Sequence, residues 1–585
     1  MNMKNTLKYI AVVAAVLSLA SCAKFLDRPT EDNYNVDNFY KTDQQCEQGV
    51  NYLYNSPWYD FQRGFIKIGE VMSGNMYWGQ SPYLDFTTNG TDVDLVNMSY
   101  SLWAVNGHAN TVIDNILNAD GPSVEAKKKY VGEALVWKAF AYFFMVRTFG
   151  EVPIIHNNTE LLTSGEYNTV SKVDRQSVYD YIIYTVETAM DLLPKQTAKW
   201  DRRIDYYAAE ALLAKVYLTK AGLSGQLSQA DLKKASTHAK DVIDHSGRTL
   251  TPVFSDVFRL APSVYNATGE SLISWQWTVD DQQWTRQNTL QSDLAMVGFD
   301  ENGDVWGGWG GPSVDLADAF GVKVTDDPAL RANEKDQRRK ATMMMPGDKY
   351  DYFWTDKGGF DFLRFIYDTE YGAGGPGGQM QCPTGANNVK HLYGDNADHI
   401  AGVGVPAQRM ANELPTHLIR LSDVYLIYAE AEFLAGDKDQ ALVYVNKVRA
   451  RAGADELDAL TYADIWKERR LELAGEGDRW YDYVRRSYYD MDYCINELKA
   501  QRRSDYYGLD KLYKGYFETG VWSKKGQLQD VGYPGTDYDN PNVTASSFQL
   551  PFPTEDVIFN ERMASDAKSV HVENVRETYP YNYKW

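Results

Sequence analysis

Residues 421–453 read LSDVYLIYAEAEFLAGDKDQALVYVNKVRARAG, and this stretch decides the fold. Apolar residues recur every three or four positions in its first half, at Leu421, Val424, Tyr425, Tyr428 and Ala431. This spacing predicts one amphipathic helix. Gly436 then breaks the pattern, and a second helical stretch follows a turn of Gly, Asp and Lys. The sequence therefore predicts two consecutive helices joined by a short turn.

Helix, turn and helix in this order resemble a tetratricopeptide-like unit, whose repeat is about 34 residues. The stretch YYAAEALLAKVYLTKA (206–221), followed by a helix predicted over 231–246, gives a weaker second copy. Two further helices are predicted over 128–149 and 173–193, each stopped by a Gly or a Pro. Such pairs stack side by side into a curved wall. The regularity is degenerate, so the pattern indicates tetratricopeptide-like pairs rather than consensus repeats.

The chain is predicted to be mostly α, with two kinds of region. Helical pairs are expected over about 104–247 and 416–487. Loops with a few short strands are expected over about 55–103 and 250–415, where short apolar runs alternate with Gly, Asp, Asn and Pro. A long irregular region inside a compact protein is usually functional, so the loop-rich part is the expected ligand-binding part.

The N-terminus predicts the compartment. Lys4 and Lys8 precede an apolar run of 12 residues, YIAVVAAVLSLA (9–20), which is too short to span a bilayer and is typical of a secretory signal. The run ends in LASC (19–22), which resembles the lipobox of bacterial lipoproteins. We expect residues 1–21 to be a signal peptide, Cys22 to be lipidated, and residues 22–585 to form one domain. An ordinary signal peptide with an accidental Cys is the alternative.

Charge and cysteine content exclude some functions. The formal net charge is −21, and it becomes −23 without residues 1–21, which carry two lysines. Such a surface repels phosphate backbones, so nucleic acid is not an expected partner. The remaining cysteines, Cys46, Cys382 and Cys494, form neither a disulfide framework nor a zinc motif. One disulfide among them and no disulfide are both open.

Several stretches together resemble the SusD/RagB-type nutrient-binding lipoproteins of Gram-negative bacteria. They occur in order along the whole chain: CAKFLD (22–27), NFYKTDQQCEQGVNYLY (38–54), GEALVWKAFAYFFMVRTFGEVPII (132–155), HLIRLSDVYLIYAEAEFLAG (417–436), VNKVRARAG (445–453), ERRLELAGEGDRWYDYVRR (468–486) and FQLPFPTEDVIFN (548–560). The chain departs from the family pattern at Lys138, where Arg is usual, and at Asp423 and Asp556, where Glu is usual. Each match is weak alone, and jointly they are specific.

The resemblance implies a fold and a function. The fold is a SusD-like domain with four tetratricopeptide-like pairs on one side and the ligand site on the other. The protein is expected on the outer face of the outer membrane, held by its lipid anchor. It would bind an oligosaccharide and deliver it to a SusC-like TonB-dependent transporter, without catalysis. A peptide-binding RagB-like lipoprotein and a scaffold that binds only the transporter are the alternatives.

Other motifs favour neither an enzyme nor a cofactor. Glu476, Arg479, Asp482 and Arg485 are three residues apart, so each can pair with the next on a helix, which is a structural pattern. The glycines at 372, 374 and 377 spell GxGxxG, but no helix is expected to follow. DENGD (300–304) offers Asp300, Asn302 and Asp304 as the first ligands of a calcium loop, although position 12 is Gly311 rather than Glu. Hence no cofactor is expected, and a structural calcium ion is a weak candidate.

Two segments combine glycine with aromatic residues. DVWGGWGGPS (304–313) and GNMYWGQSPYLDF (74–86) place indole and phenol rings on pliable loops, where they can stack on the apolar face of a sugar. The alternative is that these rings seal a small core of the loop itself. The family's ligand site tends to use both segments. The expected ligand-binding residues are Asn75, Tyr77, Trp78, Tyr83, Trp284, Asn288, Trp306, Trp309, Arg364 and Tyr393.

Overall fold

The computed structural model describes residues 39–195, 201–260, 269–279, 284–300, 307–371, 378–408, 410–523 and 530–585. Several predicted features lie outside the described residues: the signal peptide 1–21, Cys22, Asn302, Asp304, Trp306 and the glycines at 372, 374 and 377. Among the described helices, none is both long and apolar enough to cross a membrane.

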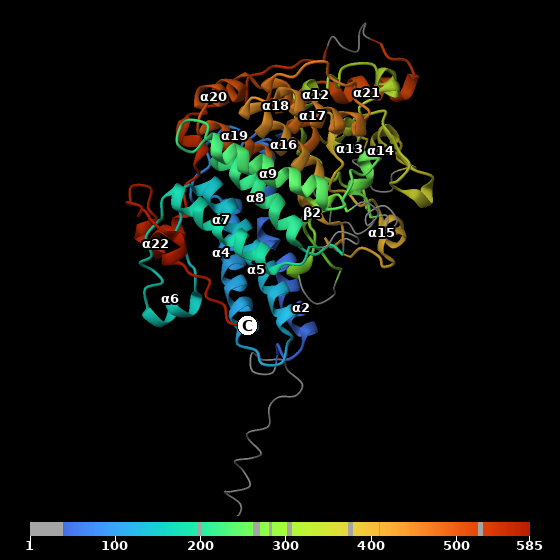
Figure 1. Ribbon diagram of the computed structural model, residues 1–585. Coiled ribbons are helices and arrows are strands. Elements are labelled where there is room, and N and C mark those ends of the chain that lie inside the picture. The colour runs from blue at the N-terminus through green and yellow to red at the C-terminus, as the bar shows by residue number, and fades with distance from the viewer. Residues whose placement is uncertain are drawn as a thin grey trace, which may run out of the picture.

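Long helices pack side by side in one row, as predicted (Figure 1). The row consists of α4 (Val93–Leu117), α5 (Val124–Phe149), α7 (Arg175–Leu192), α8 (Tyr206–Lys220), α9 (Gln229–His245), α16 (Leu421–Ala435) and α17 (Lys438–Ala452). Each helix contacts the next one in this order. Between Tyr130 and Phe149 every residue of α5 is buried, which explains why its sequence is apolar on all sides. The wall of helix pairs is therefore confirmed.

The turn between α16 and α17 has the geometry that the sequence predicts. Helix α16 ends at Gly436, which adopts a left-handed conformation with φ 106°. This conformation costs a residue with a Cβ atom more than it costs glycine. The next residue, Asp437, caps α17 by accepting a hydrogen bond from the backbone N–H of Gln440. The Gly-Asp pair thus ends one helix and begins the next.

The loop-rich part is a long excursion from this row. Strands β2 (Ser271–Trp275) and β8 (Thr416–Arg420) pair antiparallel, with Ser271 opposite Arg420, and so close the base of the excursion. Two other small sheets lie within it: β4 (Met343–Met344) with β7 (Asn387–Asn388), and β5 (Lys349–Tyr350) with β6 (Phe360–Asp361). Strand β3 (Gly311–Pro312) of the excursion pairs with β1 (Met76–Tyr77), which precedes α4. Short helices connect the strands of the excursion: α11 (Leu290–Leu294), α12 (Val314–Ala319), α13 (Gln337–Thr342), α14 (Phe362–Tyr367) and α15 (Asn396–Val403).

The expected loop-rich range 55–103 is wrong in part. It contains the short helices η2 (Ser56–Phe61), α3 (Gln62–Ile66) and η3 (Lys67–Val71), and α4 begins at Val93 rather than near 104. Asp92 starts α4 by accepting hydrogen bonds from the backbone N–H groups of Asp94 and Leu95. The sequence prediction placed this start too late, although Leu95, Met98 and Leu102 recur at helical spacing and are buried.

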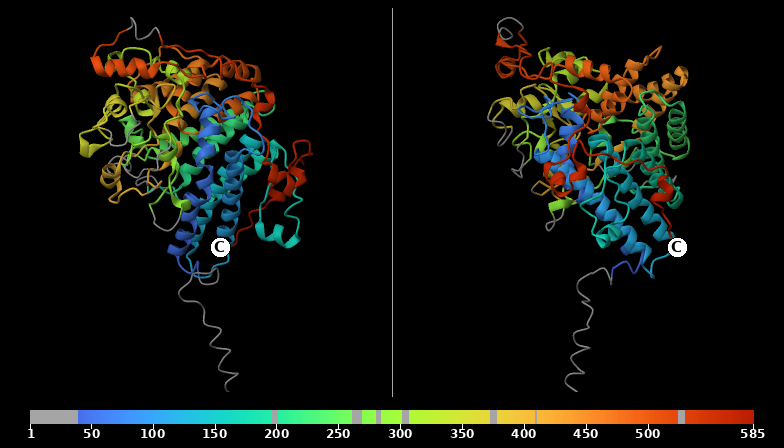
Figure 2. Two further views of the ribbon diagram at one scale, coloured as in Figure 1. Left: turned by 180° about the vertical axis from the view of Figure 1, so that it is seen from behind. Right: turned by 90° about the vertical axis from the view of Figure 1, so that its left-hand side faces the viewer.

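The C-terminal third completes the scaffold. Helices α18 (Tyr462–Leu473), α19 (Arg479–Ser487), α20 (Met491–Ala500) and α21 (Leu509–Thr519) lie at one end of the molecule. The last segment then runs back along the early helices, where α22 (Thr554–Phe559) lies beside α6 (Asn158–Ser164) and Phe559 stacks on Tyr167 (Figure 2). The remaining helices at the two ends are α2 (Asp43–Asn51) and α23 (Val575–Thr578).

A buried network of charges joins the scaffold to β8. Arg420 bonds Glu476 at 2.6 Å and Glu270 at 2.7 Å, and all three residues are buried. Of the predicted succession of pairs, Arg479–Asp482 (3.7 Å) and Asp482–Arg485 (2.9 Å) are confirmed. The predicted pair of Glu476 with Arg479 is wrong, because α19 begins only at Arg479 and Glu476 precedes it.

The structure shows whether the three described cysteines pair with one another. Cys46, Cys382 and Cys494 are free and buried, so they form no disulfide with one another. Burial raises the pKa of the Cys46 thiol to about 11, which keeps it protonated and unreactive at neutral pH.

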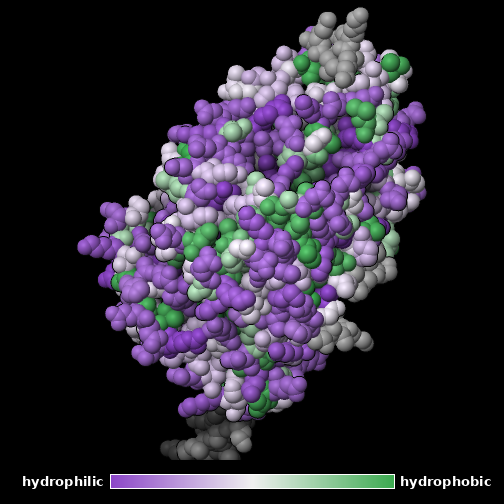
Figure 3. All heavy atoms as spheres, turned by 45° about the horizontal axis from the view of Figure 1, so that its top comes forward, coloured by the Kyte–Doolittle hydropathy of each residue, from purple (hydrophilic) through white to green (hydrophobic). Residues whose placement is uncertain are grey.

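The face shown in Figure 3 is mostly hydrophilic, and its hydrophobic residues occur in small separate groups.

Candidate ligand-binding surface

The structure brings the two predicted aromatic segments together. Strand β1 pairs antiparallel with β3, so that Tyr77 lies opposite Gly311 and Met76 opposite Pro312. The ladder continues beyond the strand, where the backbone N–H of Ser313 donates to the carbonyl of Asn75 at 2.9 Å. Segments that are more than 200 residues apart in the sequence therefore share one backbone ladder.

Trp78 follows β1 directly and lies flat against glycine. A methyl group placed on Gly310 would come within 3.0 Å of Cε3 of Trp78, so the indole rests on the bare backbone of the facing segment. The ammonium group of Lys67 lies 5.2 Å from the indole centroid. Lys67 is itself held by an ion pair with Asp94 at the start of α4. The partly exposed indole of Trp78 is thus fixed in position before any ligand binds.

Trp309 precedes Gly310 and is 64% exposed. The segment before it is held tightly, since the backbone N–H of Gly307 donates to Ser292 and a side chain on Gly307 would collide with the carbonyl of Asp293. Gly308 has a φ of 85°, which glycine adopts at low cost. A large indole that stands free on an anchored backbone is typical of a contact site.

Polar groups next to β1 come from the C-terminal part of the chain. The hydroxyl of Tyr77 donates to Asp505 at 3.2 Å, and burial together with this carboxylate raises the pKa of Tyr77. Tyr538 lies edge-on to Tyr77 with 6.0 Å between ring centroids, and its hydroxyl accepts from the backbone N–H of Gln80. We call Tyr77, Trp78, Trp309, Asp505 and Tyr538 the tryptophan surface.

Sequence reasoning missed Asp505 and Tyr538. Both lie more than 400 residues from β1, and no local spacing connects them to it. The only signal was the irregular, aromatic character of residues 500–547. Because a carboxylate oxygen and phenol rings recognise sugar hydroxyls and C–H faces, these residues fit the predicted chemistry.

Three predicted ligand residues, Asn75, Tyr83 and Asn288, are at most 1% exposed and already bonded. Asn75 is fully buried, donating to Glu70 at 2.9 Å and accepting from Arg470 at 2.7 Å. Tyr83 is fully buried and donates to Asp92. These groups have no exposed polar atom to offer, so we leave them out of the proposed surface.

Asn288 belongs to the same group. It is 1% exposed, its amide donates to the carbonyl of Leu414 at 2.6 Å, and its oxygen accepts from the backbone N–H of Leu290. Asn288 therefore holds the backbone just before α11 and does not contribute to a ligand-binding surface. The expectation from sequence failed here because an Asn next to aromatic residues looks the same whether it caps a turn or faces a ligand.

Other predicted residues lie away from the tryptophans or outside the described part. Arg364 is exposed on α14, where it pairs with Asp368 at 2.8 Å and lies over the ring of Tyr371. Tyr393 is buried and lines a separate cavity of about 210 Å³. Trp284 begins the short helix Trp284–Arg286, and its side chain, like all of Trp306, lies outside the described residues.

The calcium loop remains a prediction. Asp300 accepts a hydrogen bond from Gln291 at 2.9 Å, and its carboxylate lies 3.5 Å from the hydroxyl of Tyr393. Asn302 and Asp304 lie outside the described residues. Within the described ranges no group of three or more His, Cys, Asp or Glu residues is placed to hold a metal ion.

The acidic residues of α18 and the turn after it lack the properties of a glycosidase pair. Burial alone would raise the pKa of Glu472, but the charges of Arg451, Arg420 and Arg338 outweigh this effect and lower it to about 2. The pKa of Glu476 is also held far below its usual range. A general acid needs a raised pKa and access to substrate, whereas both carboxylates are buried and ionised.

Comparison with known proteins identifies the family. A model described as the SusD family matches residues 270–564, and one described as "Starch-binding associating with outer membrane" matches residues 24–218. A SusD-like protein of Bacteroides ovatus is 32% identical over 578 residues, covering 95% of this chain and 97% of its own. The chain therefore belongs to the SusD family.

Solved structures agree with the fold. A crystal structure described as being with xylogluco-oligosaccharide is 28% identical, with a TM-score of 0.73 and coverage of 90% of this chain and 100% of its own. A structure described as a laminarin binding SusD-like protein has a TM-score of 0.60 at 19% identity, covering 89% of this chain and 98% of its own. The second shares the fold.

Proposed function

We propose that this protein is a surface lipoprotein of the outer membrane that captures oligosaccharides by binding alone. The observation that carries this proposal is the β1–β3 ladder, which joins Trp78 to the exposed Trp309. Indoles stack on the C–H faces of pyranose rings, and Asp505 and Tyr538 can bond the hydroxyls at the rim. The relative solved with xylogluco-oligosaccharide supports a glycan as the ligand class.

The ligand class is tested by affinity electrophoresis and calorimetry of residues 23–585 against plant, microbial and host glycans and a peptide digest. We expect at least one glycan to bind, and the double variant W78A/W309A to lose that binding. The matched control is Y100A, because Tyr100 is an aromatic residue that is 67% exposed on α4. Binding of peptides with no glycan binding would support the RagB-like alternative and refute the proposal.

Anchoring rests on Cys22. The proposed lipid is a diacylglycerol thioether with a further acyl chain on the freed amine, and more than one chain is needed for stable anchoring. A C22A variant should lose incorporation of labelled palmitate and leave the membrane fraction. Labelling that persists in C22A would refute lipidation at this residue.

Delivery to a SusC-like TonB-dependent transporter is the last part of the proposal. It is supported by membership of the SusD family and by the description of the model that matches residues 24–218. A tagged protein should co-purify with a large outer-membrane transporter from its native membrane, with or without glycan. Purification without any such partner from gently solubilised membranes would contradict this part and leave glycan binding intact.

A further inference from the structure

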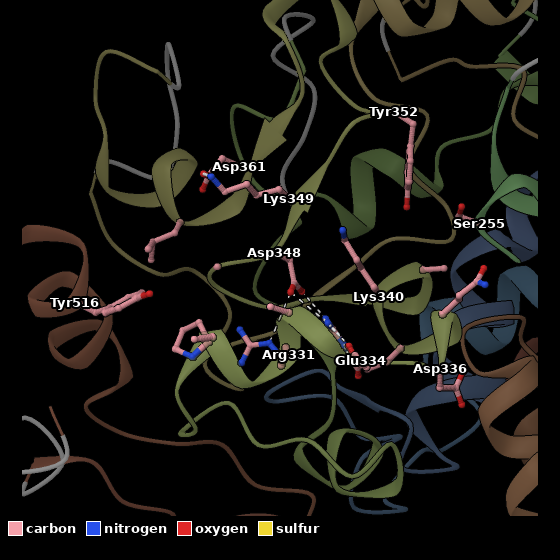
Figure 4. Close-up of a pocket in the computed structure, with 18 residues that line it drawn as sticks. Ser255, Arg331, Glu334, Asp336, Lys340, Asp348, Lys349, Tyr352, Asp361 and Tyr516 are labelled. Carbon is pink, nitrogen blue, oxygen red and sulfur yellow. Dashed lines mark hydrogen bonds and ion pairs between the residues drawn. The ribbon is translucent and has the colours of Figure 1, made fainter. Parts of the chain in front are cut away.

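A second cavity lies away from the tryptophan surface and shares no residue with it. Its volume is about 690 Å³, within the range of roughly 300–1,000 Å³ that is typical of ligand pockets. Its lining includes Lys340 on α13, Lys349 on β5, Asp361 on β6 and Tyr516 on α21. Figure 4 shows the side chains that line this pocket, with Lys349 extending toward Asp361.

The carboxylates of the pocket wall are already neutralised. Arg339 is buried and bonds both Glu334 and Asp348. Figure 4 shows Asp348 at the centre of this arrangement, bonded to arginines. On the other side, Lys349 pairs with Asp361 at 3.0 Å. Asp336, the fourth acidic residue of the wall, pairs with the buried Arg338 at 2.7 Å.

Lys340 differs from the other cations of this wall. It is exposed, it lies 5.1 Å from the ring of Tyr350, and it has no carboxylate partner among the described residues. The formal charges of the wall cancel, because four cations face four carboxylates, and each of these carboxylates has a partner whereas Lys340 has none among the described residues. On a chain with a net charge of −21, a pocket with an unpaired cation is a local exception. Its electrostatic complement is a ligand with a carboxylate.

Some hydroxyl groups of the pocket wall also lack partners. Within the described part of the chain, the hydroxyls of Ser255, Tyr352 and Tyr516 make no hydrogen bond, and all three residues are partly exposed in the pocket wall. In Figure 4, Lys340 and Tyr352 extend from opposite sides toward the same part of the pocket. Three free hydroxyls and one ammonium group in the wall of one pocket suit a ligand that is rich in hydroxyls and carries one acidic group.

Tyr352 extends this site beyond one cavity. Its ring lines both this pocket and the neighbouring cavity of about 210 Å³ that contains Tyr393. Arg259 lies over that ring, 4.8 Å from its centroid, and so holds it in place. A tyrosine held in this way, at the boundary between two cavities, presents its hydroxyl and the uncovered part of its ring to a ligand.

We propose that this pocket is a second saccharide site that binds a uronic acid unit, with Lys340 contacting its carboxylate and Tyr352 contacting its ring. The choice of a saccharide rests on the proposed function, whereas the acidic group rests on the ammonium group of Lys340, which has no carboxylate partner among the described residues. The site would retain acidic branches or blocks of a glycan whose neutral part occupies the tryptophan surface.

The test compares trigalacturonate with its methyl ester, which is the same sugar without charge. We expect the free acid to bind at least fivefold more tightly than the ester, and K340M to abolish that difference. Y352F should weaken binding of the acid two- to fivefold. Because this variant removes only a hydroxyl, it keeps the packing of the ring. K233M, which removes an exposed lysine on α9, is the matched control and should change nothing.

Three outcomes would overturn the proposal. Equal affinity for acid and ester would show that charge plays no part in binding. An unchanged affinity for the acid in both K340M and Y352F would show that the acid does not bind in this pocket. Loss of acid binding in W78A/W309A would place the acid on the tryptophan surface instead. Failure of the proposed function is distinct, because it appears as absence of neutral glycan binding in the unaltered protein.

Discussion

Replacing Trp309 by alanine should weaken glycan binding about 30-fold without affecting folding. An indole buries up to about 250 Å² when fully covered, and 64% of this residue is exposed, which leaves about 160 Å² for a ligand. A pyranose ring that covers half of this area removes about 80 Å² from water, or about 2 kcal/mol at 25 cal/mol per Å². That free energy corresponds to a factor of about 30 in Kd.

Isothermal titration calorimetry with the glycan that the panel identifies measures this loss. W309F should lose less than W309A, because a phenyl ring keeps part of the stacking area. The thermal unfolding midpoint should stay that of the unaltered protein, since Trp309 contributes little to the core. Binding of W309A within twofold of the unaltered protein would refute the reasoning, and so would an equal loss in Y100A.

Three further predictions concern the scaffold. G311A should weaken glycan binding by distorting the β1–β3 ladder, because its methyl group would meet the carbonyl of Ala386 at 2.2 Å; circular dichroism and calorimetry measure both effects. R420M should lower stability by about 3–5 kcal/mol at pH 7, because it leaves buried carboxylates such as Glu476 without their main partner. The difference in unfolding midpoint between R420M and the unaltered protein should narrow below about pH 4.5, because the carboxylates left without a partner become protonated there. K138M should be more stable than the unaltered protein at pH 7, and this gain should shrink as the pH rises toward 10.

The direction of the pH dependence expected for K138M follows from the surroundings of Lys138. It is buried, bonded to Asn110 and to the carbonyl of His156, and without an ion pair in the described structure, so burial lowers its pKa to about 7. The unfolded chain therefore binds more protons than the folded one between about pH 7 and 10.5, and stability rises with pH across this window. A stability gap between K138M and the unaltered protein that does not change with pH would contradict this account.

The helical wall was predictable because its signals are local. Gly436 and Asp437 end one helix and begin another within two residues, and the apolar run over 128–149 needs burial on all sides. The start of α4 at Val93 was missed although its signals are local too, since Asp92 caps it and Leu95, Met98 and Leu102 recur at spacings of three and four. The pattern that marks this helix start was therefore present in the sequence.

The site was predictable only in its aromatic part. Trp78 and Trp309 stood out because glycine neighbours a large ring in both segments. Asn75 looked similar, yet it is bonded by Arg470, which lies 395 residues away. Asp505, which contacts Tyr77 across 428 residues, gave no signal beyond the irregular, aromatic character of its segment. Whether a polar residue faces a ligand or the interior depends on such distant partners, and one sequence does not reveal them.

The most direct test of the central claim is a crystal structure of residues 23–585 with an oligosaccharide identified by the panel. The account predicts a sugar ring stacked on Trp309 or Trp78, with a hydroxyl bonded to Asp505. An oligosaccharide that is well ordered elsewhere, with both indoles uncovered, would contradict it.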